Sequence, residues 1–289
     1  MTGKIGIIGG SGFYNIEGIK NVKKVNVATP FGKPSDSFTT GTLEGVDLVF
    51  LARHGKGHFI TPSEVNYAAN IYGMKKLGVE RIISVSACGS LKEELKPLDI
   101  VIPDQFVDRT NQARRMTFFG DGVVAHIQFA DPFCAELSKL LYDAGSAVGA
   151  NMHMGGTYLN MEGPQFSTKA ESALYRSWGM DIIGMTNMSE AKLAREAEIC
   201  YATLACITDY DCWRMNEVSE TVSLEMIIQN LMKNVQVSKN ILKTVLPKMK
   251  NGRACACGSA LKDSIVTRPD AIPPATKKRL KLIIGKYIK

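Results

Sequence analysis

The sequence contains no apolar run of the roughly 18–20 residues that a membrane-spanning helix needs, so we expect no membrane partner. Its first residues pass straight into a strand-like segment, without the charged and apolar regions of a signal peptide. Aromatic residues make up 8% of the chain, and the hydrophobic share of 45% and the charged share of 22% are ordinary for a globular protein. We therefore expect a cytoplasmic protein with a sizeable core.

The body of the chain also lacks an excess of positive charge, although the whole chain carries +7. Residues 248–289 hold eleven Lys and Arg against two Asp, a net charge of +9, whereas residues 1–247 hold 24 basic and 26 acidic side chains, a net charge of −2. Such a body is not expected to attract nucleic acid. We expect one domain over residues 1–248 and a basic tail over residues 249–289. The tail is expected to end in an amphipathic helix that docks on the body or on a neighbouring subunit, with a membrane-surface or nucleic-acid role as the alternative.

Strand-like runs alternate with helical segments along the chain, which is typical of an α/β sheet with helices on both faces. The first strand is predicted by the run KIGIIGG, and a hairpin is predicted to turn at residues 43–45. A helix is predicted over residues 61–78, with Thr61 as its N-cap and Glu64 as the reciprocal cap. Residues 98–108 are predicted to form one strand.

Several predicted strands end in small or polar residues, where an α/β sheet collects its ligands. These ends are Gly9 to Gly12, Arg53-His54, Ser86 to Gly89, Met185-Thr186 and Asp209-Tyr210-Asp211. Their convergence predicts a ligand site at one edge of the sheet.

The glycines of GIIGGSG argue against a dinucleotide at this site. A dinucleotide clasp has the spacing G-x-G-x-x-G, with an acid about 20 residues further on. Here the spacing is G-x-x-G-G-x-G, and the next strand-like segment ends without an acid. The backbone amides of the glycines and the Ser11 hydroxyl suit a small anion such as phosphate, to which Arg53 adds a planar fork of donors.

Eight blocks of the sequence resemble those of the methylthioadenosine phosphorylases, in the trimeric branch of the purine nucleoside phosphorylase superfamily. In chain order the blocks are GIIGGSG, TPFGKPSD, LARHG, PSEVNYAANI, SACGSL, DIVIPDQFVDRT, EGPQFSTKAE and TDYDCW. The resemblance runs from about Lys4 to Leu246 and implies a single α/β domain with a mixed, curved sheet flanked by helices. It also implies a pentosyltransferase of purine and methionine salvage, without a cofactor, that is a homotrimer or a dimer of trimers. The implied reaction converts 5′-methylthioadenosine and inorganic phosphate to adenine and 5-methylthioribose 1-phosphate.

The resemblance also assigns expected roles to individual residues. The phosphate would be held by Ser11, Arg53, His54, Ser86, Ala87 and Thr186. The nucleoside would be held by Phe166, Ile183 and Met185, with the alkylthio pocket lined by Leu224 and Ile227. His126 would reach into the site of a neighbouring subunit, and the adenine edge would face Asp209 and Asp211.

The chemistry of the implied reaction fits these acids. Phosphate attacks the sugar C1′ itself, so the protein has to position the reactants and stabilise charge on the departing purine. We expect burial to raise the pKa of Asp209 so that it donates a proton near purine N7. A carboxylate at Asp209 or Asp211 accepts from the amino group of adenine but repels the carbonyl of a 6-oxopurine.

Other interpretations stay open at this point. Gly184 stands where human-type relatives have Asn, which bears on the sugar and base contacts and on specificity. The alternative functions are a purine nucleoside phosphorylase of broader, 6-oxopurine or methylthioinosine specificity, and a non-catalytic nucleoside or phosphate sensor. The plain structural alternatives are a surface pair at Arg53 and His54, loop caps at Asp209 and Asp211, and a core position for Phe166.

The sequence argues against a metal site and leaves the state of the seven cysteines open. His54 and His58 have the spacing of zinc ligands on a helix, but the glycines beside them argue against a helix, so we expect no metal. The resemblance suggests a disulfide between Cys134 and Cys200, and a second bridge that is either Cys255–Cys257 or Cys206 to the tail. Reduced thiols are the alternative.

Overall fold

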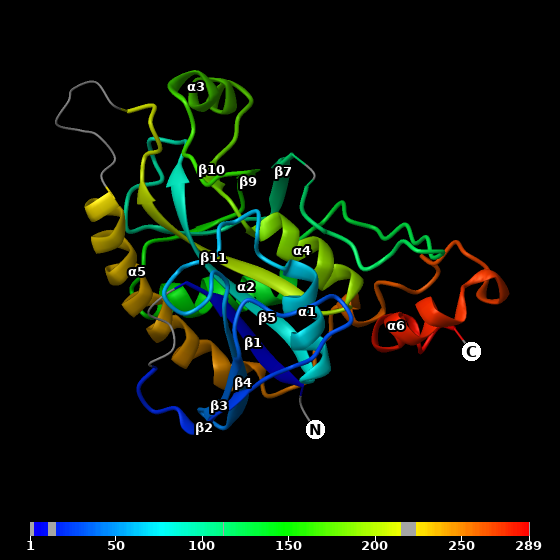
Figure 1. The fold of residues 1–289 in the computed structure, drawn as a ribbon. Coiled ribbons are helices and arrows are strands. Elements are labelled where there is room, and N and C mark those ends of the chain that lie inside the picture. The colour runs from blue at the N-terminus through cyan, green and yellow to red at the C-terminus, as the bar shows by residue number, and fades with distance from the viewer. Residues whose placement is uncertain (1–2, 11–15, 112, 215–223, 289) are drawn as a thin grey trace.

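The computed structural model describes residues 3–10, 16–111, 113–214 and 224–288, and it shows a sheet flanked by helices on both faces (Figure 1). The strands are β1 (Lys4–Gly9), β2 (Lys20–Val25), β3 (Phe38–Leu43), β4 (Val46–Ala52), β5 (Val79–Ser90), β6 (Ile100–Ile102), β7 (Gln105–Arg109), β8 (Met152–Met154), β9 (Thr157–Met161), β10 (Ile182–Gly184) and β11 (Cys200–Asp209). The helices are α1 (Tyr67–Lys76), α2 (Ala135–Ala147), α3 (Lys169–Ser177), α4 (Asn187–Glu196), α5 (Leu224–Val245) and α6 (Pro274–Ile284), with short 3₁₀ helices η2 (Leu246–Met249), η3 (Ala256–Ser259) and η4 (Pro269–Ala271). The predicted class, a single α/β domain with a mixed sheet, is confirmed.

Strand β5 is the centre of the sheet, whose path runs β2-β3-β4-β1-β5-β10-β9-β7. Along most of its length β5 pairs in parallel with β1 and β11, and its last residues pair with β10 in the antiparallel sense. Gly89 therefore has Asp209 as its neighbour on β11 and Ile183 as its neighbour on β10. Three strands meet at this point, close to the predicted site.

Alternating residues of the buried strands supply two separate cores, as a period of two requires. On β1, Ile5 and Ile7 pack with residues of α2 and α5, whereas Ile8 packs with residues of α1 and α4. On β4, Phe50 belongs to the first core and Val49 to the second. Both faces of the sheet are thus covered, which leaves the strand ends as the place for a ligand.

Two details of the predicted secondary structure are wrong. Helix α1 begins at Tyr67, because the Asn66 side chain caps it by accepting from the N–H of Ala69 at 3.0 Å. Thr61 and Glu64 instead close a turn before the helix, with the Thr61 hydroxyl 2.7 Å from the Glu64 carboxylate.

The strand predicted over residues 98–108 is two strands, β6 and β7. They pair with different partners, β6 with β11 and β8, and β7 with β9. The chain changes partners between them at Pro103, which has no N–H to donate to a ladder.

The basic tail docks on the body. Leu280, Ile283 and Ile284 of α6 are all buried in the second core. Figure 1 shows the tail beside the long segment that joins β7 to α2, and the two are linked by a bridge between Ala125 and Ile265. In the described part of the chain, no helix combines the length and the apolar character needed to cross a membrane.

Candidate active site

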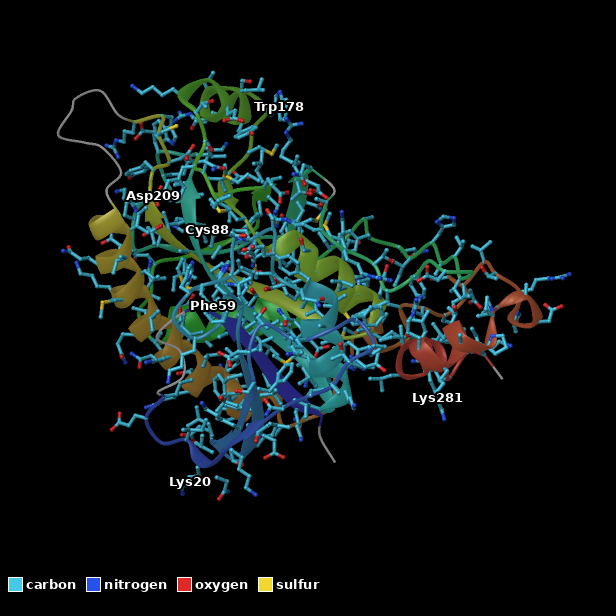
Figure 2. The ribbon with its side chains drawn as sticks, in the orientation of Figure 1. Lys20, Phe59, Cys88, Trp178, Asp209 and Lys281 are labelled. Atoms are coloured by element: carbon cyan, nitrogen blue, oxygen red, sulfur yellow. The ribbon has the colours of Figure 1, made fainter. Side chains whose placement is uncertain are left out.

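The parallel strands β1, β4, β5 and β11 bring their carboxyl ends to one edge of the sheet. Figure 2 shows Asp209 close to Cys88 at that edge, and Cys88 pairs with Ile207 on the neighbouring strand. Ala87 is exposed although the residues on either side of it on β5 are buried. The centre of the sheet therefore meets solvent at this point, as a binding site requires.

Arg53, directly after β4, is buried and held by the side chains of Glu190 and Ser84. Its Nε donates to Glu190 Oε1 at 2.5 Å, and its Nη2 donates to Ser84 Oγ at 2.6 Å and to Glu190 Oε2 at 3.2 Å. Burial lowers the pKa of Arg53, but the Glu190 carboxylate outweighs it and keeps this pKa above the usual value. Arg53 is thus a fixed, partly neutralised cation, and the alternative of a surface pair at Arg53 and His54 is excluded for Arg53.

Asn187, at the start of α4, accepts hydrogen bonds from the hydroxyl groups of the predicted phosphate residues Ser86 and Thr186, and from Tyr158. Its Oδ1 atom accepts from Ser86 at 2.8 Å, from Tyr158 at 3.1 Å and from Thr186 at 3.2 Å. An amide oxygen has two lone pairs, so it cannot accept good hydrogen bonds from three donors at once. At least one of the hydroxyls is therefore available for another acceptor. Thr186 is also the N-cap of α4, where the helix dipole favours an anion.

Gly184 is explained by the Tyr158 hydroxyl. A Cβ atom at position 184 would lie only 1.9 Å from Tyr158 Oη, the atom that donates to Asn187. The departure from the family pattern at Gly184 therefore makes room for a phenol that belongs to the hydroxyl network.

His54 is a neutral acceptor at this edge. Its Nδ1 lies 2.8 Å from the carbonyl oxygen of Ile60, so Nδ1 carries the hydrogen and donates. Burial and, next, the charge of Arg53 lower the pKa of His54 to about 4. The neutral ring then has a lone pair on Nε2, which can accept a hydrogen bond from the protonated oxygen of a hydrogen phosphate.

Asp209 and Asp211 lie together at the end of β11, both buried. Asp209 accepts from the Thr208 hydroxyl at 2.7 Å and from the N–H of Asp211 at 2.8 Å. Burial raises the pKa of Asp209 against the lowering by these two bonds, and burial also raises the pKa of Asp211. Asp209 caps the loop, as the structural alternative held, and a buried carboxyl with a raised pKa beside a second acid is also a pattern typical of functional sites.

Gly89 keeps space open beside these acids. A Cβ atom there would lie 3.1 Å from Asp209 Oδ1 and 3.5 Å from Asp211 Cβ. Helix α5 holds the same strand end in place, since Asn230 donates to the carbonyl oxygen of Thr208 at 2.8 Å. Ile227, half-buried, lies one turn before Asn230 on that helix and hence near the strand end.

The other predicted nucleoside contacts have varied positions. The Phe166 side chain is 62% exposed, so the alternative that it is a core residue is wrong. Its ring is accessible to a ligand. Ile183 is buried beside Gly89. Met185, also expected to hold the nucleoside, accepts a hydrogen bond at its carbonyl oxygen from Arg114 at 2.5 Å.

His126 is not part of this constellation. It is exposed, and its backbone N–H donates to the carbonyl oxygen of Ser264 in the tail at 2.9 Å. In Figure 1 that segment and α6 extend on one side of the molecule and α5 lies on the other. Ser11 lies outside the described residues, and so does the side chain of Leu224, the first residue of α5.

Sequence reasoning missed the residues that support the site. They are Ser84, Arg114, Glu162, Asn187, Glu190 and Tyr201. The sequence holds a signal for two of them, since Asn187 and Glu190 are three residues apart and so share one face of α4.

Comparison with known proteins agrees with the fold. The profile of the phosphorylase superfamily matches residues 4–247, so the chain belongs to this superfamily. The class is therefore that of enzymes that use phosphate to cleave a bond, as the resemblance implied.

Within the superfamily, the similar curated proteins are S-methyl-5′-thioadenosine phosphorylases. That of Geobacter sulfurreducens is 60% identical over 288 residues and covers 100% of both chains, and that of Koribacter versatilis is 56% identical, covering 99% of this chain and 97% of the relative.

Solved structures of the same kind share the fold. A methylthioadenosine phosphorylase from an antarctic soil metagenomic library is 50% identical, with a TM-score of 0.91 over 98% of this chain and 99% of that chain. A methylthioadenosine phosphorylase from Schistosoma mansoni, in complex with adenine, is 38% identical with a TM-score of 0.84 over 90% and 96%.

Proposed function

We propose that this chain cleaves the N-glycosidic bond of 5′-methylthioadenosine with inorganic phosphate, giving adenine and 5-methylthioribose 1-phosphate. The observation that carries the proposal is a buried acid pair, Asp209 and Asp211, at the same sheet edge as Arg53 and the Asn187 hydroxyl network. A relative named for this activity is 60% identical over the full chain.

In the proposed mechanism, phosphate lies between the end of β4 and the start of α4. Arg53 and the hydroxyls of Ser86 and Thr186 donate hydrogen bonds to its oxygens. Neutral His54 accepts a hydrogen bond from its protonated oxygen. Ser11 and the backbone at Ala87 complete the donor set. Positioned in this way, phosphate attacks C1′ as the glycosidic bond breaks, so no protein nucleophile is required.

The acid pair acts on the departing base. Asp209 donates a proton near N7, which the raised pKa favours, and the neighbouring carboxylate accepts from the 6-amino group. Phe166 packs on the base or sugar, and Ile183 and Met185 line the nucleoside subsite. Leu224 and Ile227 line the pocket for the alkylthio group.

Adenosine is proposed as a second, slower substrate. An apolar pocket rejects an added hydroxyl only weakly, and a Schistosoma mansoni relative carries the name adenosine/methylthioadenosine phosphorylase. The proposed assembly is a homotrimer or a dimer of trimers in the cytoplasm, in which the exposed His126 serves a neighbouring subunit's site.

The test is an assay of free base from methylthioadenosine, adenosine, inosine and methylthioinosine. The two 6-amino nucleosides should react, and the two 6-oxo nucleosides should react about a thousandfold more slowly, because a carboxylate repels their carbonyl. Comparable rates for inosine would favour a broad purine nucleoside phosphorylase, and no base from any of the four would favour a nucleoside sensor.

A further inference from the structure

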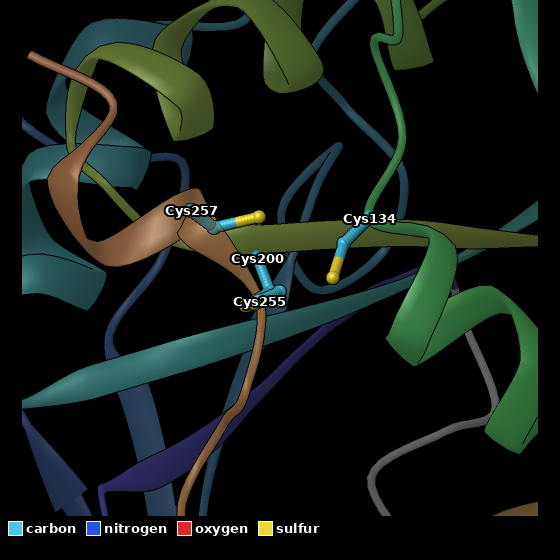
Figure 3. A group of neighbouring side chains, drawn as sticks. All are labelled: Cys134, Cys200, Cys255 and Cys257. Carbon is cyan, nitrogen blue, oxygen red and sulfur yellow. Dashed lines mark hydrogen bonds between the residues drawn. The ribbon is translucent and has the colours of Figure 1, made fainter.

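Four cysteines from three distant parts of the chain meet where the tail joins the body (Figure 3). Cys134 is the N-cap of α2, Cys200 is the first residue of β11, Cys255 is the N-cap of η3, and Cys257 lies within η3. The four sulfur atoms all lie within 4.8 Å of one another. Cys134, Cys200 and Cys257 are buried, and Cys255 is half-buried.

The disulfides suggested from the resemblance are absent from the described residues, in which all seven cysteines are free thiols. Cys200 and Cys255, which the suggestion did not pair, have sulfur atoms 3.3 Å apart. Cys206 is not in the cluster, since its sulfur contacts Ser238 Oγ at 3.4 Å, so a bridge from Cys206 to the tail is wrong.

We propose that Cys134, Cys200, Cys255 and Cys257 bind one zinc ion, which fastens the tail to the body. Tetrahedral ligation with Zn–S bonds of about 2.3 Å places every pair of sulfurs about 3.8 Å apart, close to the arrangement present here. Two disulfides would bring the sulfurs together in pairs and would not require all four to be mutual neighbours. Four thiolates without a free position are typical of a structural zinc site.

The surroundings fix the cysteines and compensate the charge. Glu136, in the first turn of α2, accepts from the N–H of Cys255 at 2.8 Å and holds the Cys-x-Cys loop against that helix. Arg253 donates to the carbonyl oxygen of Glu198 at 2.9 Å and lies 3.8 Å from the Cys200 sulfur. A zinc tetrathiolate has a net charge of −2, which this guanidinium partly offsets.

The site is open to ions from solvent. A surface hollow of about 580 Å³ is lined by Cys134, Cys255 and Cys257. Binding forms four Zn–S bonds and releases the thiol protons to water, with no electron transfer, so it proceeds under reducing conditions.

The test uses the full chain, purified with a reductant and without chelator, with zinc measured by mass spectrometry. We expect about one zinc per chain in the wild type and less than about a tenth of that in C255S. C206S, which changes a buried cysteine outside the cluster, should keep the zinc. Substitution by Co²⁺ should give the visible bands of a tetrahedral thiolate complex, which C255S lacks.

A second measurement uses the wild type and therefore tests the proposal even if C255S folds poorly. Removing zinc from the wild type with a strong chelator should speed proteolysis near residues 249–254, and added zinc should reverse the change. The proposal is overturned if reduced wild-type protein neither contains nor takes up zinc, if all seven thiols react equally fast with and without zinc, or if the four cysteines resist reduction as disulfides. None of these results depends on the phosphorylase assay, so the two proposals fail separately.

Discussion

Arg53 and Glu190 form a buried ion pair, with Nε of one 2.5 Å from Oε1 of the other, although the two are 137 residues apart in the sequence. Arg53 follows β4, and Glu190 lies on α4, the helix that Thr186 caps. The pair therefore fixes the proposed phosphate donors of the strand end against those of the helix start.

Removing one partner of this pair should destabilise the fold. We expect Glu190→Ala to lower the free energy of unfolding by about 3–5 kcal/mol, because the Arg53 charge is left buried without its partner. The matched control is Lys139→Ala, which removes an exposed pair with Asp143 at 2.6 Å and should cost less than about 1 kcal/mol. Urea denaturation measures both, and equal losses would contradict a structural role for the buried pair.

Asp209→Asn should lower kcat by about 10²–10⁴-fold with little loss of stability, because the amide cannot donate a carboxylic proton to the base. In the wild type the protonated acid is lost as pH rises through the raised pKa, so activity should fall on the alkaline side. This alkaline decrease in activity should be absent from the pH profile of Asp209→Asn. Asp270→Asn, an exposed tail position, is the control, and activity of Asp209→Asn within a few-fold of wild type would exclude the acid role.

His54 should remain neutral through the physiological range, because burial and Arg53 lower its pKa to about 4. Its imidazole NMR signals should not titrate between about pH 5.5 and 8, whereas in urea they should titrate near the ordinary value of about 6.5. The unfolded chain binds this proton first, so His54 contributes stability that is lost as pH falls from about 6.5 towards 4. A midpoint near 6.5 in the folded protein would contradict the lowering of the His54 pKa by burial and by Arg53.

Gly184→Ala should destabilise the protein by about 1–3 kcal/mol, because the new methyl group displaces the Tyr158 hydroxyl from Asn187. Gly252→Ala is the control, since a Cβ atom there meets nothing within 4 Å. Thermal unfolding measures both variants. A Gly184→Ala protein as stable as the control would show that Tyr158 does not need this position.

The strands that position the site were predicted correctly from the sequence. A buried strand appears there as a short apolar run that ends at small or polar residues. Strand β1, the β3–β4 hairpin, β5 and β11 all follow that pattern. The start of α1 was mistaken because two capping patterns lie five residues apart, and the Asn66 side chain caps the helix.

The supporting residues could not be predicted in the same way. Glu190 lies on a helix of the sequence NMSEAKLARE, whose charged residues are typical of a solvent-exposed face. In the structure Glu190 is instead buried against Arg53. The cysteine cluster joins Cys134 and Cys200 of the body to Cys255 and Cys257, which only the packing of the tail brings there. Long-range contacts of this kind leave no periodic signal in a sequence.

The most direct test of the account is whether base release consumes phosphate. Purified full-length protein is incubated with methylthioadenosine, with and without inorganic phosphate, while adenine is followed by absorbance and sugar phosphate by ³¹P NMR. The account predicts one 5-methylthioribose 1-phosphate for each adenine and no adenine without phosphate. Equal release of adenine in phosphate-free buffer, with free methylthioribose as the product, would contradict it.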